Sequence, residues 1–290
     1  MKPASFDYLA PSTVGETLEL LERYGEDGKI LAGGQSLVPM LNFRLTKFGY
    51  LIDINNLAEL SYVDEDRGVL RIGALTRHRT IENSNIVAKA APLLATAAKW
   101  VAHPPVRTRG TVGGSLAHCD PAAEYPAVLL ALDAKILLRN RTNARLIPAD
   151  EFIKGVFETA LEPQELLTEI QVPVADESQR FGFEEFARRP GDLAVMGIAA
   201  CLTVRGQRIT DARITAFGTE GGACRIIAAE AALVDADSLA DGIEWASQAA
   251  SAVPVQSDVH ASAELRSRLA SALTRRVLTR ALSRRESFVS

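Results

Sequence analysis

The sequence has few cysteines and no long apolar run. Its 290 residues include only three cysteines, Cys119, Cys201 and Cys224, which are far apart and odd in number. An iron–sulfur cluster needs about four thiolates, so none is expected in this chain, and the pattern favours a reducing compartment over a disulfide framework. No stretch of about twenty apolar residues is present, which predicts no transmembrane segment. The first residues also lack the apolar core of an export signal, so we expect a cytoplasmic protein.

The sequence also lacks recognisable metal-binding and catalytic patterns. Its histidines show neither H-x-x-x-H nor H-E-x-x-H spacing, which argues against a catalytic zinc, and they are His78, His103, His118 and His260. The adjacent residues 118–120 cannot easily converge on one ion, so a turn that positions Asp120 is the better interpretation. No Ser–His–Asp set follows from spacing. We therefore predict no metal site and no catalytic side chain in this chain.

Positive charge is concentrated near the C-terminus. Residues 261–290 carry a net charge of +5 and leave −9 on the rest, and their arginines are Arg266, Arg268, Arg275, Arg276, Arg280, Arg284 and Arg285. A basic helix can bind nucleic acid, but the acidic remainder argues against that. An apolar stripe instead favours an amphipathic helix with arginine on its solvated face, made by Leu265, Leu269, Leu273, Val277 and Leu278. A contact with a partner subunit is the second interpretation.

Local patterns predict an α+β fold in two domains, 1–176 and 177–290. Thr13 and Glu16 form a capping box for a first helix that ends before Gly25. In the first domain we expect strands at 29–32, 50–54, 60–63, 69–73 and 134–138, and helices after Ser36, at 86–100 and at 127–132. In the second we expect strands at 181–187, 194–204 and 208–217, and helices at 226–234, 239–251 and 262–282. Strands followed by helices predict an antiparallel sheet backed by helices.

Two glycine-pair motifs are the main candidates for a binding site. They are Ala32-Gly33-Gly34-Gln35-Ser36 and Thr111-Val112-Gly113-Gly114-Ser115. Glycine permits positive φ and close approach of a ligand, so successive N–H groups can converge on an anion. Two such turns can hold one pyrophosphate from two sides, although each alone is more often a plain tight turn. Neither matches the Rossmann or the P-loop pattern.

Several segments, in the same order along nearly the whole chain, resemble one family. They include KILAGGQSLVPML at 29–41, LIDIN at 51–55, IGALTRH at 72–78, RGTVGGSLAHCDPAAEYP at 109–126 and FARRPGD at 186–192. These are similar to the FAD-binding medium subunit of molybdenum hydroxylases, the xanthine dehydrogenase and carbon monoxide dehydrogenase family. The resemblance implies a PCMH-type FAD-binding domain of two α/β lobes, followed by a smaller C-terminal domain of antiparallel sheet and helices.

The resemblance also implies roles for individual residues. The two glycine motifs would hold the FAD pyrophosphate through backbone N–H groups and hydroxyls. Glu124 matches the acidic residue that binds a sugar hydroxyl, and Asp120 is the weaker candidate. Val101 matches an apolar position near the adenine or the flavin, and Leu167 one near the adenine end, with plain core packing as the alternative for both.

Further positions match segments near the flavin ring. Thr76 and His78 follow a strand and can approach the isoalloxazine, although a lone histidine is more often structural. Arg188 and Arg189 precede a Gly-Asp pair after which relatives often carry an aromatic residue. Leu193 stands there in this chain, which casts doubt on ring stacking and can leave one flavin face more open.

The function implied by the resemblance is electron transfer within a complex. A small subunit would pass electrons from two [2Fe–2S] clusters to FAD in this chain, which would reduce an external acceptor. A large molybdopterin subunit would hydroxylate the substrate, in a dimer of heterotrimers. Residues 102–109 look closer to enzymes of N-heteroaromatics than to the carbon monoxide enzyme. Carbon monoxide or aldehyde oxidation, a flavin-free scaffold and a self-sufficient flavin oxidase are the alternatives.

Overall fold

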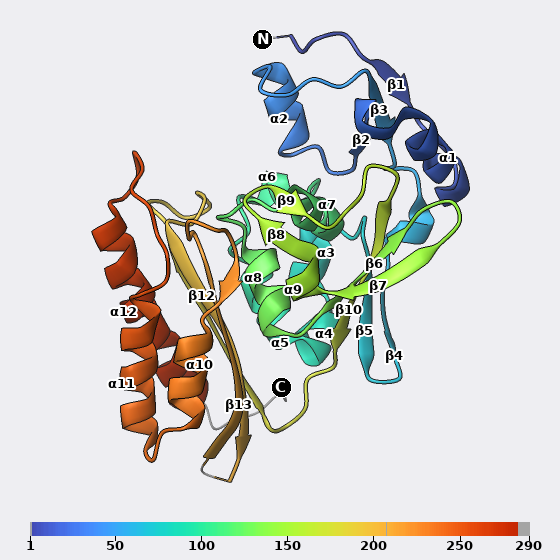
Figure 1. Cartoon of the computed structure of the whole chain (residues 1–290). Helices are drawn as coiled ribbons and strands as arrows, with labels where there is room; N and C mark the ends of the chain where they lie inside the picture. The colour runs from blue at the N-terminus through green and yellow to red at the C-terminus, as the bar shows by residue number, and fades with distance from the viewer. Residues whose placement is uncertain (1, 207, 284–290) are drawn as a thin grey trace.

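The computed structural model describes residues 2–206 and 208–283, and its N-terminal lobe is built on a small parallel sheet (Figure 1). The strand order is β1-β3-β2, with β1 at Asp7–Leu9, β3 at Tyr50–Asp53 and β2 at Gly28–Leu31. Helices α1 (Val14–Tyr24) and α2 (Leu37–Asn42) connect the strands. The first helix begins and ends where the sequence predicts. Thr13 accepts from the Glu16 N–H at 3.1 Å, but the Glu16 carboxylate returns to Ser12 N rather than to Thr13.

The second lobe contains a five-stranded antiparallel sheet of order β4-β5-β10-β6-β7. The strands span Val63–Asp66 (β4), Val69–Gly73 (β5), Leu166–Pro173 (β10), Lys135–Arg139 (β6) and Ala144–Pro148 (β7). Sequence analysis missed β7 and β10 and placed one strand too early, because Ala58–Leu60 forms a 3₁₀ turn. The short connections α9 (Ala149–Phe152), β8 (Ile153–Gly155) and β9 (Glu158–Thr159) were also not predicted.

Short helices cover this sheet, and the structure differs from the prediction at two places. The helices are α3 (His78–Asn83), α4 (Asn85–Ala90), α5 (Pro92–Ala98), α6 (Pro104–Arg107), α7 (Val112–His118) and α8 (Glu124–Ala131). The helix expected at 86–100, with Pro92 near its first turns or at a break, is broken before Pro92 into α4 and α5, because proline cannot continue a helix from the preceding turn. The second glycine motif is the first turn of α7 rather than a loop, with Thr111 as its N-cap.

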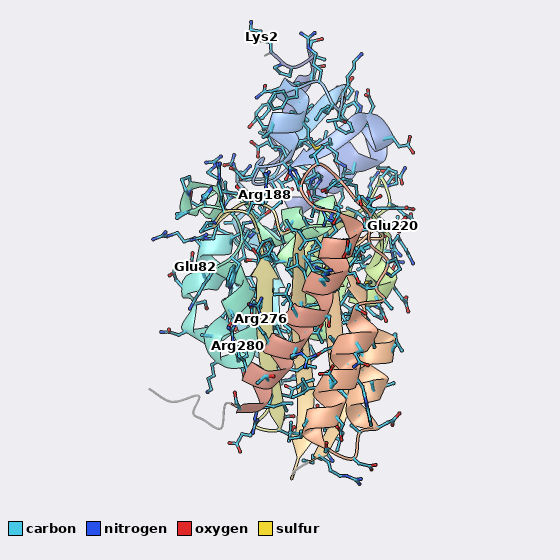
Figure 2. The ribbon with its side chains drawn as sticks, turned by 90° about the vertical axis from the view of Figure 1, so that its left-hand side faces the viewer. Lys2, Glu82, Arg188, Glu220, Arg276 and Arg280 are labelled. Atoms are coloured by element: carbon cyan, nitrogen blue, oxygen red, sulfur yellow. The ribbon has the colours of Figure 1, made fainter. Side chains whose placement is uncertain are left out.

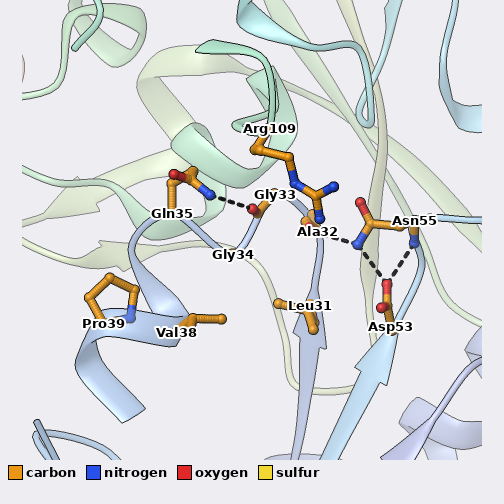
Figure 3. A pocket seen from close by; sticks show the side chains of 10 residues that line it. All are labelled: Leu31, Ala32, Gly33, Gly34, Gln35, Val38, Pro39, Asp53, Asn55 and Arg109. Carbon is orange, nitrogen blue, oxygen red and sulfur yellow. Dashed lines mark hydrogen bonds between the residues drawn. The ribbon is translucent and has the colours of Figure 1, made fainter. Parts of the chain in front are cut away.

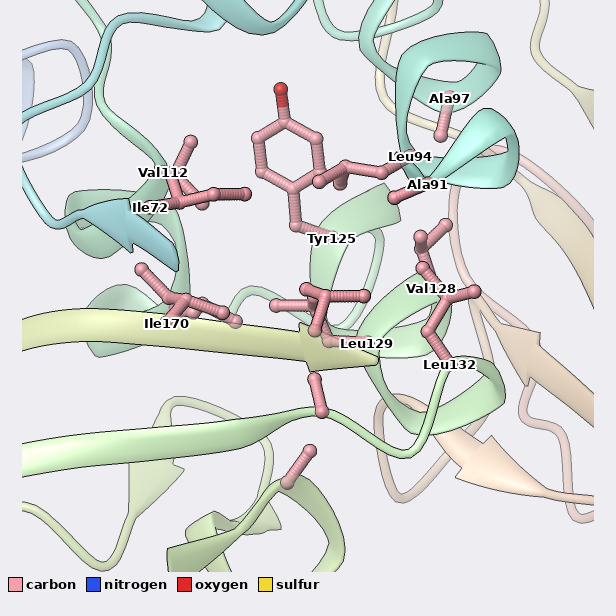
Figure 4. Close-up of a cluster of buried hydrophobic side chains, with 14 of the residues drawn as sticks. Ile72, Ala91, Leu94, Ala97, Val112, Tyr125, Val128, Leu129, Leu132 and Ile170 are labelled. Atoms are coloured by element: carbon pink, nitrogen blue, oxygen red, sulfur yellow. The ribbon is translucent and has the colours of Figure 1, made fainter. Parts of the chain in front are cut away.

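The main core lies between the sheet of the second lobe and the helices α5, α7 and α8. Figure 4 shows Tyr125 among Ile72, Leu94 and Val112, with its ring enclosed by aliphatic side chains. Tyr125 is fully buried and its hydroxyl has no hydrogen-bond partner among the described residues. The core therefore holds α7, which carries the second glycine motif, against the sheet.

The C-terminal part is an antiparallel sheet with helices on one face, as predicted. The strands are β11 (Gln179–Phe186), β12 (Met196–Arg205), β13 (Arg208–Phe217) and β14 (Cys224–Arg225), in that order. Helices α10 (Ile227–Val234), α11 (Leu239–Ala250) and α12 (Ala263–Ser283) cover the outer face, and α5 and α8 meet the inner face (Figure 1). Thr215 joins the two parts, since its hydroxyl donates to Ala127 O at 2.9 Å.

Helix α12 corrects the expected distribution of arginine. Arg266 is buried rather than solvated, and it donates to the carbonyls of Val195 and Gly218 and to Asp258. Arg276 and Arg280 both pair with Glu184 of β11, and Figure 2 shows them side by side along the helix. The predicted apolar stripe is buried at Leu273, Val277 and Leu278, whereas Leu265 is exposed. Arg284 and Arg285 lie outside the described residues.

Candidate functional site

The first glycine motif forms a tight bend between β2 and α2 with unused backbone donors. Gly34 has φ of +71°, a conformation that side chains disfavour. Among the described residues, the N–H groups of Gly33, Gly34, Gln35 and Ser36 make no hydrogen bond. Four consecutive free N–H groups at such a bend form a concavity that attracts anions. This motif therefore has the donor set that a phosphate ligand needs.

The second motif differs, because its N–H groups are used inside the protein. Val112 N donates to Thr76 O at 3.0 Å, and Gly113 N donates to Ala74 O at 2.9 Å. Gly114 N donates to the Thr111 hydroxyl at 3.1 Å. A Cβ on Gly113 would lie 2.6 Å from the Ala74 Cβ, so glycine is needed here for close packing. The second motif thus acts as the support on which the first one rests.

The structure brings the two motifs into direct contact. A Cβ on Gly33 would lie 2.5 Å from Arg109 O and 2.7 Å from the Gly110 Cα. A Cβ on Gly114 would approach the Ala32 Cβ to 3.9 Å. Segments that are distant in sequence therefore share one surface, and the glycines allow their backbones to meet.

Three side chains outside the motifs stabilise this contact through hydrogen bonds. Asn55 Nδ2 donates to Ala32 O at 2.7 Å, and Arg77 Nη2 donates to Asn55 Oδ1 at 2.7 Å. Arg77 Nη1 donates to Arg109 O on the other side of the contact. Asp53 orients Asn55, because Asp53 Oδ1 accepts a hydrogen bond from Asn55 Nδ2 at 2.6 Å. Sequence analysis assigned no role to these residues, although Asn55 lies in the quoted LIDIN run.

A cavity of about 330 Å³ opens beside the first motif, at the carboxyl ends of β2 and β3 (Figure 3). Its apolar wall consists of Leu31, Val38 and Pro39, and the Arg109 side chain extends over the opposite rim. Asp53 is the acidic group of the lining. Burial raises the pKa of Asp53, but hydrogen bonds from Tyr8 and Asn55 and the charge of Arg109 outweigh it, so the net pKa is lowered.

This donor set fits a nucleotide cofactor. Free N–H groups and a guanidinium can neutralise a phosphate, and a carboxylate can accept from a sugar hydroxyl. The carboxyl ends of parallel strands are also the usual ligand-binding edge of an open α/β sheet. The glycine cradle, Arg109 and Asp53 therefore suit a phosphate-bearing, hydroxylated group such as part of FAD.

Glu124 lies at the first residue of α8, after the second motif. It is only 8% exposed, and burial, helped by Asp120, raises its pKa to about 7. Asp120 is partly exposed, and its Oδ1 accepts from Ala122 N at 2.8 Å. Asp120 thus shapes the turn before α8, whereas Glu124 keeps a carboxyl group free of any basic partner among the described residues.

The remaining candidate residues are buried in the protein. Val101 and Leu167 belong to the main core. Thr76 is 1% exposed and its hydroxyl donates to Tyr62 O at 2.8 Å. His78 is also buried, and burial together with Arg107 and Arg77 lowers its pKa to about 4. Its Nε2 lies against Gly110, which indicates a packing role for a neutral imidazole.

The loop after β11 is exposed. Arg188 and Arg189 are exposed, and Leu193 is 68% exposed. Gly191 has φ of +84° and lies against the His103 ring, so the loop packs on the segment before α6. Leu193 is therefore free to meet a ligand or another chain.

Comparison with known proteins matches both parts of the chain. Residues 4–175 match the FAD binding domain in molybdopterin dehydrogenase, and residues 181–281 match the CO dehydrogenase flavoprotein C-terminal domain. The 6-hydroxypseudooxynicotine dehydrogenase complex subunit alpha of Paenarthrobacter nicotinovorans is 42% identical, over 98% of this chain and 97% of the relative. The nicotine 6-hydroxylase medium subunit of the same organism is 38% identical, over 98% and 100%.

Solved structures agree in fold. The carbon monoxide dehydrogenase from Hydrogenophaga pseudoflava superposes with a TM-score of 0.95 at 37% identity, covering 98% of this chain and 99% of that chain. Quinoline 2-oxidoreductase from Pseudomonas putida 86 superposes with a TM-score of 0.91 at 37% identity, covering 97% and 98%. None of the helices in the described part is long and apolar enough to cross a membrane.

The resemblance noted in the sequence and the α+β fold expected from it are thereby confirmed, as is FAD as the cofactor of the family's binding domain. The matches together span most of the chain. The chain belongs to the FAD-binding medium subunits of the molybdenum hydroxylases, an oxidoreductase family.

Proposed function

We propose that this subunit transfers electrons through FAD within a three-subunit complex. Electrons would come from the [2Fe–2S] clusters of a small subunit and leave to an external acceptor, while a large molybdopterin subunit hydroxylates the substrate. The observation that carries the proposal is the run of unused backbone N–H groups from Gly33 to Ser36, which lies beside Arg109 in the same cavity. Bound FAD supplies the redox chemistry, and the chain positions it.

We propose that the cofactor is held mainly by the first glycine motif. The free N–H groups from Gly33 to Ser36 bind the pyrophosphate, with Ala32 anchored by Asn55. We propose that the second motif, Thr111 to Ser115, supports this cradle and contributes the Ser115 hydroxyl, since the Thr111 side chain is buried and caps Gly114. Glu124 accepts from a sugar hydroxyl. Since Val101, Leu167 and Thr76 are buried, we propose that they shape the site from behind, as does Asp120 through its turn.

The substrate of the complex is proposed to be an N-heteroaromatic compound. Three relatives aligned over 98% of this chain carry names that include nicotine or caffeine. Carbon monoxide is the second candidate, because a Hydrogenophaga pseudoflava medium chain is 39% identical over 78% of this chain. Turnover of the intact complex with pyridine, purine and quinoline substrates and with carbon monoxide distinguishes the two. Oxidation of carbon monoxide alone would reject the first candidate.

The same proposal extends to organisation and location. We propose a domain boundary at residues 176–177, close to the gap between the two matched families. We also propose that the complex is a dimer of heterotrimers. We propose that it lies in the cytoplasm, because the three cysteines are free thiols, which are typical of a reducing compartment. Mass measurement of the native complex tests the assembly.

The decisive experiment for the cofactor is spectroscopic. The purified chain is expected to show a flavin absorption spectrum and to release about one FAD per chain on denaturation. Absence of flavin after incubation with added FAD would contradict the proposal and favour a scaffold role. Turnover of an organic donor by the isolated chain would instead support a self-sufficient flavoenzyme.

A further inference from the structure

Helix α2 ends in a strained turn. Leu45 N donates to Met40 O at 2.9 Å, and Arg44 N donates to Leu41 O at 3.0 Å. These two bonds are the pattern of a Schellman C-cap, which needs a left-handed residue and usually has glycine there. Arg44 takes that place with φ of +58°. Because backbone strain of this kind is concentrated at functional sites, the turn is a candidate for a function of its own.

The turn presents an apolar patch to solvent, which we define as Val38, Pro39, Phe43 and Leu45. Leu45 is 73% exposed, although the residue at this position of a Schellman turn frequently packs back on the helix. Phe43 is 63% exposed, and Val38 and Pro39 are exposed on the same helix. A single exposed apolar residue is ordinary, but a cluster on one short helix and its final turn indicates an interaction surface.

The apolar patch begins at the rim of the cavity beside the first glycine motif. Val38 and Pro39 line that cavity (Figure 3). Phe43 N donates to Pro39 O at 2.9 Å, so Phe43 lies one helical turn beyond the rim. Figure 1 shows α2 at the outer edge of the N-terminal lobe. A protein that covers the patch is therefore brought next to the proposed cofactor site.

The segment that contains the apolar patch is basic. Residues 28–52 include no aspartate or glutamate, although the whole chain has a net charge of −4, and their basic residues are Lys29, Arg44 and Lys47. Arg44 and Lys47 are exposed and take part in no ion pair within the described part of the chain. Complementary charge steers association and orients the partner, so this segment suits a partner with an acidic surface.

We propose that the apolar patch is the docking surface for the small [2Fe–2S] subunit, whose contacting face is apolar with a border of carboxylates. This inference rests on the proposed electron transfer through FAD. Electron transfer slows steeply with distance, so the donor subunit has to cover a surface at the rim of the cofactor cavity. Phe43 and Leu45 supply the buried centre of the interface, and Arg44 and Lys47 orient the partner from its rim.

The first test measures assembly of the native complex with Leu45→Asp and Phe43→Asp. A carboxylate in the centre of this interface loses its water and meets an acidic partner, so we expect the Kd for the small subunit to rise at least about tenfold. Val259→Asp is the matched control, because Val259 is 93% exposed but lies in the C-terminal part. It should leave that Kd within about twofold of the wild type. Sedimentation of the complex at serial dilution measures these values.

The charge of the segment is tested separately with Arg44→Asn and Lys47→Gln. Asparagine removes the charge of Arg44 and tolerates the left-handed backbone. We expect each substitution to weaken binding of the small subunit about threefold at low salt, and the difference to disappear at high salt. Effects that are the same at low and high salt would contradict an acidic partner.

FAD content separates failure of this proposal from failure of the proposed function. The substituted side chains are exposed, so every variant should bind FAD and unfold as the wild type does. Wild-type affinity for the small subunit in both Leu45→Asp and Phe43→Asp would overturn the proposal, and so would loss of the large subunit alone. Absence of FAD or of a [2Fe–2S] subunit from the wild-type complex would reject the proposed function instead.

Cross-linking gives a second readout in the intact complex. A photo-crosslinking residue in place of Leu45 is expected to join this chain to the small subunit, whereas the same residue in place of Val259 should not. A cross-link from position 45 to the large subunit or to a second copy of this chain would overturn the proposal.

Discussion

Gly33 lies directly against the carbonyl of Arg109, so closely that a Cβ would come within 2.5 Å of the oxygen. This contact joins the parallel lobe to the antiparallel lobe at the point where both glycine motifs meet. Arg77 and Asn55 bridge the same junction through hydrogen bonds. The proposed cofactor site therefore depends on the junction between two lobes and not on one loop.

Gly33→Ala is expected to separate the two motifs. The added methyl group meets backbone atoms that cannot rotate away, so we expect a loss of stability of about 1–3 kcal/mol and a rise in the Kd for FAD of about tenfold. Thermal unfolding and fluorescence titration measure the two effects. Gly15→Ala in α1 is the control, because its Cβ has no neighbour closer than 3.8 Å. Equal effects in both variants would refute a specific role for Gly33.

The Arg77–Asn55 bond is expected to show energetic coupling. The variants are Arg77→Met, Asn55→Ala and the double substitution. We expect a coupling free energy of about 0.5–3 kcal/mol, since the pair is partly buried and joins two lobes. Denaturant unfolding of the four proteins measures it. The exposed pair Arg141–Glu22 is the comparison and should couple by about 1 kcal/mol or less. Additive effects at Arg77 and Asn55 would mean that the bond does not hold the junction.

Stability of the FAD-free chain is expected to fall as the pH rises toward 9. Folding raises the pKa of Glu185 to about 9 and that of Glu124 to about 7. At a pH between the unfolded and the folded pKa of either group, the folded chain therefore binds more protons than the unfolded chain. For each such group, the free energy of unfolding then falls by up to about 1.4 kcal/mol for every pH unit by which the pH rises. Denaturant unfolding from pH 6 to 9 tests this. Glu185→Gln should flatten the dependence, and an unchanged slope would contradict it.

Arg266→Met is expected to destabilise the C-terminal domain. The guanidinium is 7% exposed and bonds two carbonyls and Asp258, which the methionine leaves without these donors. We expect a loss of about 2–4 kcal/mol. Thermal unfolding measures it, with Arg268→Met as the exposed control on the same helix. Equal melting temperatures for the two variants would show that the buried bonds of Arg266 do not contribute to the stability of the fold.

Local sequence determined the elements whose signals lie within one turn or one strand. Thr13 and Gly25 mark the ends of α1, and the three long strands of the C-terminal sheet lie close to their predicted ranges. Both glycine motifs were also visible as short patterns. In each case the physical cause is a backbone preference or a cap that acts over a few residues.

Tertiary structure alone decided how those elements form a site. It showed that the first motif keeps its N–H groups free while the second uses them to bind Thr76 and Ala74. It also buried Arg266, which the sequence pattern places on the solvated face of a helix. These outcomes depend on hydrogen bonds and packing between residues far apart in the chain. Such contacts have no local signature, because the partner of each group is chosen only when the lobes and domains meet.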